Sequence, residues 1–235
     1  MLTGCFHLPP RGQPATDETD TRSDERRAMV DEQLRPRGIT DPRVLAAMEA
    51  VPRHRFVPRG AAARAYADSP LRIGYDQTIS QPYIVAYMTE AAALPDDATV
   101  LEIGTGSGYQ AAVLAEIARR VYTIEIVPEL ATRARTLLAE LGYDNVEVAL
   151  SDGYRGWPEH APFDAIVVTA APDHVPPALV EQLAVGARLV IPVGPFGGLR
   201  QAMTLVTRGR DGATTEETLP VRFVPMTGAA QSRPR

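Results

Sequence analysis

The sequence is short of several residue types, and each shortage narrows what the protein can be. It has one cysteine, Cys5, so no disulfide can form within the chain and a thiolate-rich metal site is excluded. No run of about 18 apolar residues occurs, which argues against a membrane-spanning helix. These shortages predict a soluble, cytoplasmic protein with no membrane partner.

Lysine is absent, and the 24 basic residues are all arginine. Acidic residues outnumber them, so the formal net charge is −5. Binding to a phosphate backbone usually requires a basic surface, and we therefore expect no nucleic-acid partner. The four histidines, His7, His54, His160 and His174, fall at no spacing typical of metal ligands, so no metal site is expected.

The length and hydrophobic content indicate one α/β domain with terminal additions. The chain has 235 residues, of which 45% are hydrophobic, enough to bury a single sizeable core. Residues 1–22 and 229–235 lack helical or strand periodicity and are predicted to be disordered. Between them we expect a helical region over residues 23–95 and an α/β core over residues 96–228. We expect a monomer.

The core alternates apolar strand patterns with amphipathic helix patterns, which predicts a mainly parallel sheet covered on both faces. Two final strand patterns flank a turn-rich link at residues 208–212 and predict an antiparallel edge. The expected fold is therefore a Rossmann-like, doubly wound, three-layer α/β/α sheet. The predicted strands are residues 100–103, 121–126, 146–150, 165–169, 189–193, 203–207 and 221–224. The predicted helices are residues 24–34, 41–50, 83–94, 110–118, 128–141 and 177–183.

The strongest local signal is a glycine-rich turn. The apolar run at residues 100–103 leads into Gly104, Gly106 and Gly108 at alternate positions, and a helical pattern follows. Glycines let the chain turn tightly and let a ligand approach backbone atoms that a Cβ would block. Thr105 and Ser107, which alternate with the glycines, are predicted to contact the same ligand.

The spacing and charge of this turn favour one class of nucleotide. Dinucleotide-binding loops follow the pattern G-x-G-x-x-G and direct helix amides at a pyrophosphate. Here the pattern is G-x-G-x-G, and Glu102 precedes it. An acid beside the turn would repel a pyrophosphate, whereas it suits a ligand with an amino group and a sulfonium, which indicates S-adenosylmethionine.

Two further acidic residues follow neighbouring strands. Glu125 ends the next strand, where an acid can accept hydrogen bonds from ribose hydroxyls, and Ile126 is assigned to the same site. Asp152 follows the third strand and suits the adenine amine, with Gly153 admitting the ring, although an ordinary Asx turn explains Asp152 equally well. Since ligands of parallel sheets bind at the carboxyl ends of the strands, we predict that these residues and Glu102 share one pocket.

The segment Thr78-Ile79-Ser80-Gln81-Pro82 introduces the helix predicted at residues 83–94. A serine two residues before a proline at a helix start is a natural N-cap, so position alone favours capping as the role of Ser80. Thr78 likewise suits the end of a strand.

Together these features resemble the protein-L-isoaspartate O-methyltransferases. The resemblance covers residues 29–227. It rests on the segment Thr78-Ile79-Ser80-Gln81-Pro82, the glycine turn, and residues 163–166, 170–172, 176–179, 188–194 and 223–227. Methyltransferases in general share the glycine turn, whereas the Thr-Ile-Ser-Gln-Pro segment makes the match specific.

The resemblance implies that S-adenosylmethionine is the methyl donor and that isoaspartyl-containing proteins and peptides are the substrates. It assigns Ser80 and Thr78 to the methyl-acceptor site, where they orient the free α-carboxylate of an L-isoaspartyl residue. It also implies that Gln81, Val224 and Thr227 bind the substrate.

The implied reaction needs few catalytic groups. Some members of the family have histidines where this chain has Tyr83 and Val85. A peptide carboxylate with a pKa of about 3.3–3.9 is already ionised at neutral pH, so no general base is required. The resemblance further implies that the methyl ester closes to a succinimide without enzymic help and that hydrolysis returns part of it to normal aspartate.

Other functions were weighed against this one. A serine hydrolase is disfavoured because Gly106-Ser107-Gly108 lacks the G-x-S-x-G spacing of a nucleophile elbow. Two alternatives stay open from the sequence. One is a methyltransferase for a small molecule or another protein site, and the other is a non-catalytic module that binds S-adenosylmethionine.

Overall fold

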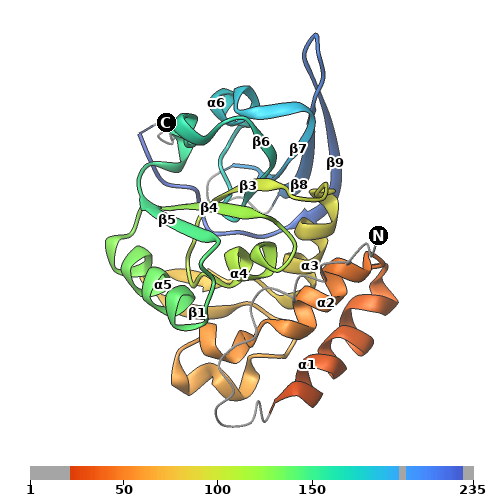
Figure 1. Cartoon of the computed structure of the whole chain (residues 1–235), viewed down its shortest axis with the longest axis vertical. Helices are drawn as coiled ribbons and strands as arrows, with labels where there is room; N and C mark the ends of the chain where they lie inside the picture. The colour runs from red at the N-terminus through yellow and green to blue at the C-terminus, as the bar shows by residue number, and fades with distance from the viewer. Residues whose placement is uncertain (1–21, 196–199, 230–235) are drawn as a thin grey trace, which may run out of the picture.

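The computed structural model describes residues 22–195 and 200–229, built around a seven-stranded sheet (Figure 1). Its strand order is β5-β4-β3-β6-β7-β8-β9. The first five strands pair in parallel, whereas β8 pairs antiparallel with β7 and β9 pairs antiparallel with β8, which confirms the predicted sheet. The strands are β3 (Thr99–Ile103), β4 (Arg120–Glu125), β5 (Val146–Leu150), β6 (Phe163–Val168), β7 (Leu183–Val193), β8 (Gln201–Arg208) and β9 (Ala213–Val221).

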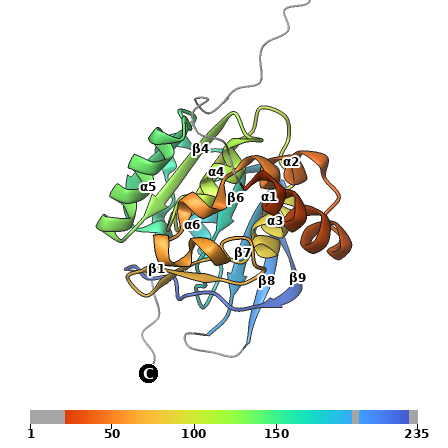
Figure 2. The ribbon, with the colours of Figure 1, turned by 90° about the horizontal axis from the view of Figure 1, so that it is seen from below.

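Helices cover the two faces of the sheet unequally (Figures 1 and 2). On one face α3 (Pro82–Ala91), α4 (Tyr109–Ala115) and α5 (Pro128–Glu140) share a single hydrophobic core with α1 (Ser23–Met29) and α2 (Pro42–Ala50). The other face is covered by α6 (Pro177–Glu181) and by short 3-10 turns at Gly153–Arg155 and Pro158–His160. The helical region over residues 23–95 is thus part of the same core as the sheet.

Two helix ends follow their sequence signals. Asp41 is the N-cap of α2, and its side chain accepts a hydrogen bond from the Arg43 amide at 2.8 Å. After α5, Gly142 adopts φ +80°, and the Tyr143 amide donates to the Leu138 carbonyl at 3.0 Å. These ends agree with the helices predicted at residues 41–50 and 128–141, since an acid accepts from the first turn of a helix and glycine tolerates the left-handed conformation after its end.

The C-terminal hairpin differs from the prediction. The turn between β8 and β9 lies where expected, with the Gly209 amide donating to the Gly212 carbonyl at 2.6 Å. However, β9 spans Ala213–Val221, so the strand predicted at residues 221–224 was wrong. Most side chains of this edge strand are exposed, and it therefore lacks the apolar alternation that marks a half-buried strand. Residues 222–224 leave the sheet instead.

The N-terminal region contains local structure that periodicity did not predict. The helix expected over residues 24–34 continues after α1 as a π-helical turn, Val30–Leu34. A small hairpin pairs β1 (Leu71–Gly74) with β2 (Gln77–Ile79). Its turn residues Tyr75 and Asp76 have φ of +52° and +55° without the Asn-Gly signal of such turns. This hairpin carries Thr78 and leads directly into α3.

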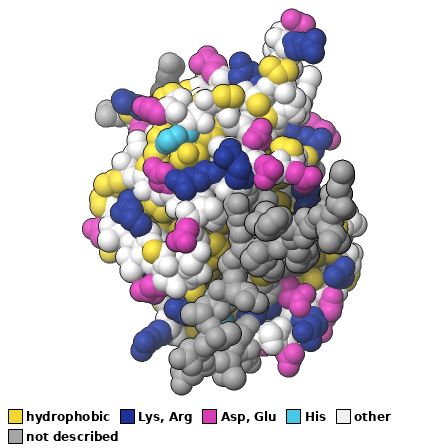
Figure 3. All heavy atoms as spheres, viewed as in Figure 1, with side chains coloured by type: hydrophobic (Ala, Val, Ile, Leu, Met, Phe, Trp, Pro, Cys, Tyr) yellow, Lys and Arg dark blue, Asp and Glu magenta, His cyan; other side chains and the backbone are white. Residues whose placement is uncertain are grey.

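No helix among the described residues is long and apolar enough to cross a membrane. Arginine and acidic side chains are interspersed on the face drawn in Figure 3. Residues 1–21 and 230–235 lie outside the described part of the chain, and with them Cys5 and most of the predicted terminal disorder.

Candidate functional site

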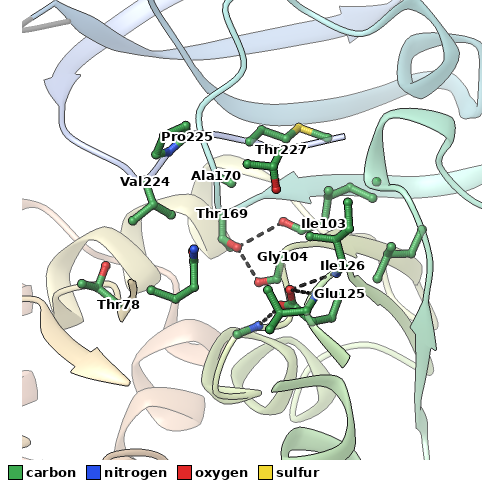
Figure 4. A pocket seen from close by; sticks show the side chains of 16 residues that line it. Thr78, Ile103, Gly104, Glu125, Ile126, Thr169, Ala170, Val224, Pro225 and Thr227 are labelled. Carbon is green, nitrogen blue, oxygen red and sulfur yellow. Dashed lines mark hydrogen bonds between the residues drawn. The ribbon is translucent and has the colours of Figure 1, made fainter. Parts of the chain in front are cut away.

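A pocket opens at the carboxyl ends of β3, β4 and β6 (Figure 4). Counted together with its opening to solvent, it encloses about 590 Å³ of empty space. Its lining residues are Gln77, Thr78, Ile103, Gly104, Gly106, Ile124, Glu125, Ile126, Val127, Gly153, Thr169, Ala170, Val224, Pro225, Met226 and Thr227. Of the predicted site residues, the pocket brings together Thr78, Gly104, Gly106, Glu125, Ile126, Gly153, Val224 and Thr227.

The glycine turn forms the floor of the pocket with its backbone. Gly104, Gly106 and Gly108 adopt φ of +96°, +53° and +89°, a region that residues with a Cβ rarely enter. A Cβ on Gly104 would lie 2.5 Å from the Thr169 hydroxyl oxygen. Gly108 instead packs against α5, where Leu138 lies 3.3 Å from its ideal Cβ position. Glycine is therefore required at Gly104 both by its conformation and by its neighbour.

Glu125 is the acidic side chain in this pocket. Its Oε2 accepts from the Gly106 amide at 2.7 Å, and its Oε1 accepts from the Ile126 and Val127 amides at 2.9 and 3.0 Å. A carboxylate has about four acceptor positions, so roughly one is left for a ligand hydroxyl. Glu125 thus fixes the glycine turn while still offering an acceptor to the pocket.

Glu102 lies elsewhere, because side chains alternate along a strand and its neighbour Ile103 is the one that lines the pocket. Thr123 Oγ1 donates to Glu102 Oε2 at 2.5 Å, and the Thr105 and Thr123 hydroxyl oxygens are 2.6 Å apart. Burial raises the pKa of Glu102 to about 8, so this carboxyl is mainly neutral at pH 7. Its position indicates support of the turn through Thr123 and Thr105, and the predicted contact with the cofactor stays a prediction.

Asp152 also lies outside the pocket lining, next to Gly153, which lines it. Its Oδ1 accepts from the Tyr154 amide at 3.0 Å, as in an Asx turn, and its Oδ2 accepts from the Ala229 amide at 2.8 Å. The second bond attaches the C-terminal segment to the end of β5. Contact between Asp152 and an adenine amine stays a prediction.

The C-terminal segment closes one side of the pocket. After leaving β9 it lies beside Ala171, whose amide donates to the Val224 carbonyl at 2.8 Å and whose carbonyl accepts from the Met226 amide at 2.8 Å. Val224 and Thr227 were predicted as site residues, and both line the pocket. The neighbouring Pro225 and Met226 were not predicted, although they belong to the same segment.

The residues of the segment Thr78-Ile79-Ser80-Gln81-Pro82, which we call the acceptor segment, differ in their position relative to the pocket. Thr78 lines the pocket, whereas Ser80 and Gln81 do not. Gln81, not Ser80, is the N-cap residue of α3, so the capping interpretation of Ser80 was wrong. The Ser80 carbonyl accepts from Arg53 Nη2 at 2.7 Å, and the Gln81 amide group donates to Asp68 at 3.3 Å. These two hydrogen bonds attach the acceptor segment to residues that do not line the pocket.

Sequence reasoning missed two kinds of residue. Thr169 and Ala170 follow β6 directly, and the rule that ligands bind at the carboxyl ends of parallel strands would have found them. Arg53 is fully buried, with its Nε donating to the Ala65 carbonyl at 2.7 Å. No local sequence signal marks it, because its partners come from distant segments.

The three histidines of the described residues all contact other side chains. His54 hydrogen-bonds Tyr66, His160 stacks on Tyr122 and His174 contacts Asp173, all outside the pocket lining. Among the residues that the structure describes, no group of three or more potential metal ligands occurs. His7 lies outside those residues.

Comparisons with known proteins agree on one family. The family profile described as protein-L-isoaspartate(D-aspartate) O-methyltransferase matches residues 24–231. A protein-L-isoaspartate O-methyltransferase of Gloeobacter violaceus is 63% identical over 199 residues, which cover 85% of this chain and 97% of the relative. Another, from Picosynechococcus, is 56% identical over 221 residues, or 94% and 97% of the two chains.

A solved structure is similar over nearly its whole length. It is a Plasmodium falciparum chain described as a protein-L-isoaspartate O-methyltransferase, in complex with S-adenosyl-L-homocysteine. The TM-score is 0.75 at 25% identity, and the match covers 86% of this chain and 98% of the other.

Proposed function

We propose that this chain, which belongs to the protein-L-isoaspartate(D-aspartate) O-methyltransferase family, methylates the free α-carboxylate of L-isoaspartyl residues in damaged proteins and peptides. S-adenosylmethionine is the methyl donor, S-adenosyl-L-homocysteine is the product, and the ester initiates repair through a succinimide. The main support is the 63% identity to a relative of that name over 97% of its length. The single cysteine also suits action in the reducing cytoplasm.

The chemistry of the pocket fits this donor. Ile103, Ile124 and Ile126 give it apolar walls suited to a purine and a thioether, and Glu125 retains an acceptor position for a ribose hydroxyl. Among the described residues that line it, Glu125 has the only charged side chain, which suits a cationic ligand. When bound, S-adenosylmethionine supplies an electrophilic methyl group.

The protein contributes mainly position and shelter. The substrate carboxylate is ionised at neutral pH, so its oxygen needs orientation rather than a base. Thr78 lines the pocket, and Ser80 follows it along the same segment. We assign these two hydroxyls to holding the carboxylate, with Gln81, Val224 and Thr227 contacting the surrounding peptide. Residues 224–227 help to exclude water from the reacting groups.

A single assay distinguishes this activity from its alternatives. Purified protein is incubated with methyl-labelled S-adenosylmethionine and paired peptides that differ only in aspartate against isoaspartate. Base-labile label on the isoaspartyl peptide alone is the expected result. Label on neither peptide, with S-adenosyl-L-homocysteine still bound in calorimetry, would favour a small-molecule methyltransferase or a non-catalytic binding module.

Replacing Ser80 with alanine should lower turnover of the isoaspartyl peptide by about tenfold, the effect of losing a hydrogen bond to a charged group. The affinity for S-adenosyl-L-homocysteine should change little, because Ser80 does not line the pocket. Steady-state kinetics and calorimetry measure the two effects. Ser23→Ala, at the start of α1, is the matched control and should behave as wild type. A large loss of cofactor affinity in Ser80→Ala would contradict an acceptor-side role.

A further inference from the structure

The hairpin of β1 and β2 carries an arginine beside Thr78. Its residues alternate in burial, and the buried side chains of Leu71, Ile73 and Ile79 form its inner face. Arg72 and Thr78 are exposed and pair directly across the two strands. Side chains that lie directly opposite in an antiparallel pair share one face, with their Cβ atoms about 4.5–5.5 Å apart. Arg72 therefore lies next to the threonine that lines the pocket.

A second arginine, Arg222, lies in the C-terminal segment two residues before Val224. It is exposed and follows the end of β9 directly, whereas Val224 lines the pocket. Figure 4 shows Thr78 and Val224 on the side of the pocket away from Glu125, and we call this the acceptor side. Each of the two lining residues on the acceptor side thus has an arginine close to it, one by strand pairing and one along the chain.

Both arginines are available to a ligand. Neither forms a hydrogen bond or ion pair with another residue in the part of the chain that the structure describes. Other exposed arginines differ in this respect, since Arg35 pairs with Asp31 and Arg43 pairs with Asp41. The acid of the hairpin itself, Asp76, lies in its turn and pairs with neither arginine.

The surrounding charges favour an anionic partner for these arginines. The chain carries a net charge of −5, and Glu125 has the only charged side chain among the described residues that line the pocket. Most of the protein would therefore repel an acidic peptide, and cations at the acceptor side offset that repulsion locally. Arginine suits this task because its guanidinium binds a carboxylate through two parallel hydrogen bonds.

The reacting carboxylate is not the best partner for them. Two parallel hydrogen bonds from arginine would stabilise its charge more before the reaction than in the transition state, where that charge is being neutralised. Neither arginine lines the pocket in which this group must react. In an extended peptide successive residues advance by about 3.3 Å, so side chains one or two positions from the isoaspartyl residue are within reach of an arginine side chain at the pocket edge.

We propose that Arg72 and Arg222 bind acidic side chains that flank the isoaspartyl residue, an assignment that rests on the proposed function. The enzyme then prefers damaged sites in acidic stretches of a protein. The two arginines act on peptide binding, so they change KM rather than kcat, and they leave the affinity for the cofactor unchanged.

The test uses isoaspartyl peptides with one glutamate at one of the two positions before or after the isoaspartate, each matched by a peptide with glutamine there. Transfer of label from S-adenosylmethionine gives KM and kcat for every peptide. In wild type, glutamate at one or more positions should lower KM by about three- to tenfold, the range for hydrogen-bonded charges that are partly exposed.

The variants assign this preference to the two side chains. The double variant Arg72→Gln/Arg222→Gln should have equal KM for both members of every peptide pair, and each single variant should lose part of the preference. Arg72→Lys/Arg222→Lys keeps both charges and should retain part of it. A single glutamine variant that kept the whole preference would remove that arginine from the assignment.

Arg210→Gln is the matched control. Arg210 is exposed in the turn between β8 and β9 and forms no ion pair with a described residue. Ala202 at the start of β8 pairs with Val193 at the carboxyl end of β7, so this turn lies at the sheet edge opposite the pocket. The control changes the net charge by the same amount as either single variant, and it should keep the wild-type preference.

The proposal is overturned if wild type has equal KM for glutamate and glutamine at every position, or if the double variant keeps the preference. Loss of the preference in Arg210→Gln would overturn it as well, because net charge alone would then be the cause. Weaker binding of S-adenosyl-L-homocysteine to the double variant in calorimetry would contradict a role on the peptide side. If wild type methylated none of the isoaspartyl peptides, the proposed function itself would fail, and this outcome is separate from the others.

Discussion

Gly104→Ala should reduce the affinity for S-adenosyl-L-homocysteine by about a hundredfold or more while leaving a folded protein. The backbone strain of an alanine at this φ and the steric clash of its Cβ together cost several kcal/mol, on the order of 2–5. The residue sits at φ +96°, and its new Cβ would lie 2.5 Å from the Thr169 hydroxyl oxygen. Real Cβ atoms essentially never make so close a contact, so the turn and Thr169 must separate. Because both line the pocket, its shape changes where the ligand binds. Calorimetry and thermal unfolding measure the two effects.

Two further variants show whether the clash is the cause. Gly38→Ala has a similar φ of +90° with nothing within 4 Å of the new Cβ, so it should lose only about 1 kcal/mol of stability and bind normally. The double variant Gly104→Ala/Thr169→Ala removes the clashing oxygen and should recover part of the lost affinity. If the double variant bound no better than Gly104→Ala, contact with Thr169 would not be the reason for glycine at this position.

Arg53→Met should lower the free energy of unfolding by about 2–6 kcal/mol, because it leaves two carbonyl groups without their donor at about 1–3 kcal/mol each. The fully buried guanidinium donates to the Ala65 and Ser80 carbonyls, both at 2.7 Å, and lies 4.8 Å from the centre of the Tyr109 ring. Methionine fills a similar volume but has no hydrogen-bond donor, so the two backbone carbonyls stay buried without a partner. Urea unfolding measures the loss.

The substitution should also affect the acceptor segment specifically. Arg53 connects Ser80 to Tyr109, the first residue of the helix after the glycine turn, so the surviving folded enzyme should have a raised KM for the isoaspartyl peptide. Arg119→Met is the control, since exposed Arg119 also donates to a backbone carbonyl, that of Asp97 at 3.2 Å. It should change stability by less than about 1 kcal/mol. Equal effects of the two variants would show that burial of Arg53 does not hold the segment.

The parts of the fold that sequence predicted well are those with strong local patterns. The buried strands β3, β4 and β6 appear as short apolar runs, and Asp41 and Gly142 mark helix ends through side-chain capping and left-handed φ. Strand β9 and the hairpin β1–β2 lack such patterns. The first exposes most of its side chains, and the second turns through Tyr75 and Asp76 rather than glycine.

The residues of the candidate site likewise include some that local sequence patterns identified and some that they did not. The glycine turn and Glu125 were found because a strand-turn-helix pattern and an acid at the next strand end are local signals. The side chain of Glu102 carries an equally clear signal, yet it is directed away from the pocket and buried, which raises its pKa to about 8. The sequence pattern identified Glu102 as a residue next to the turn but did not indicate whether its side chain faces the pocket.

By itself the sequence determined the parallel sheet, the glycine turn and the family resemblance, because each is encoded in residues close together along the chain. Only the tertiary structure decided which residues from separate segments meet. It placed the Thr169 hydroxyl against Gly104, joined Arg53 to Ser80, and laid residues 224–227 along Ala171. Such contacts depend on how the strands and loops assemble, and their energies come from burial and hydrogen bonding between distant segments, which no local pattern records.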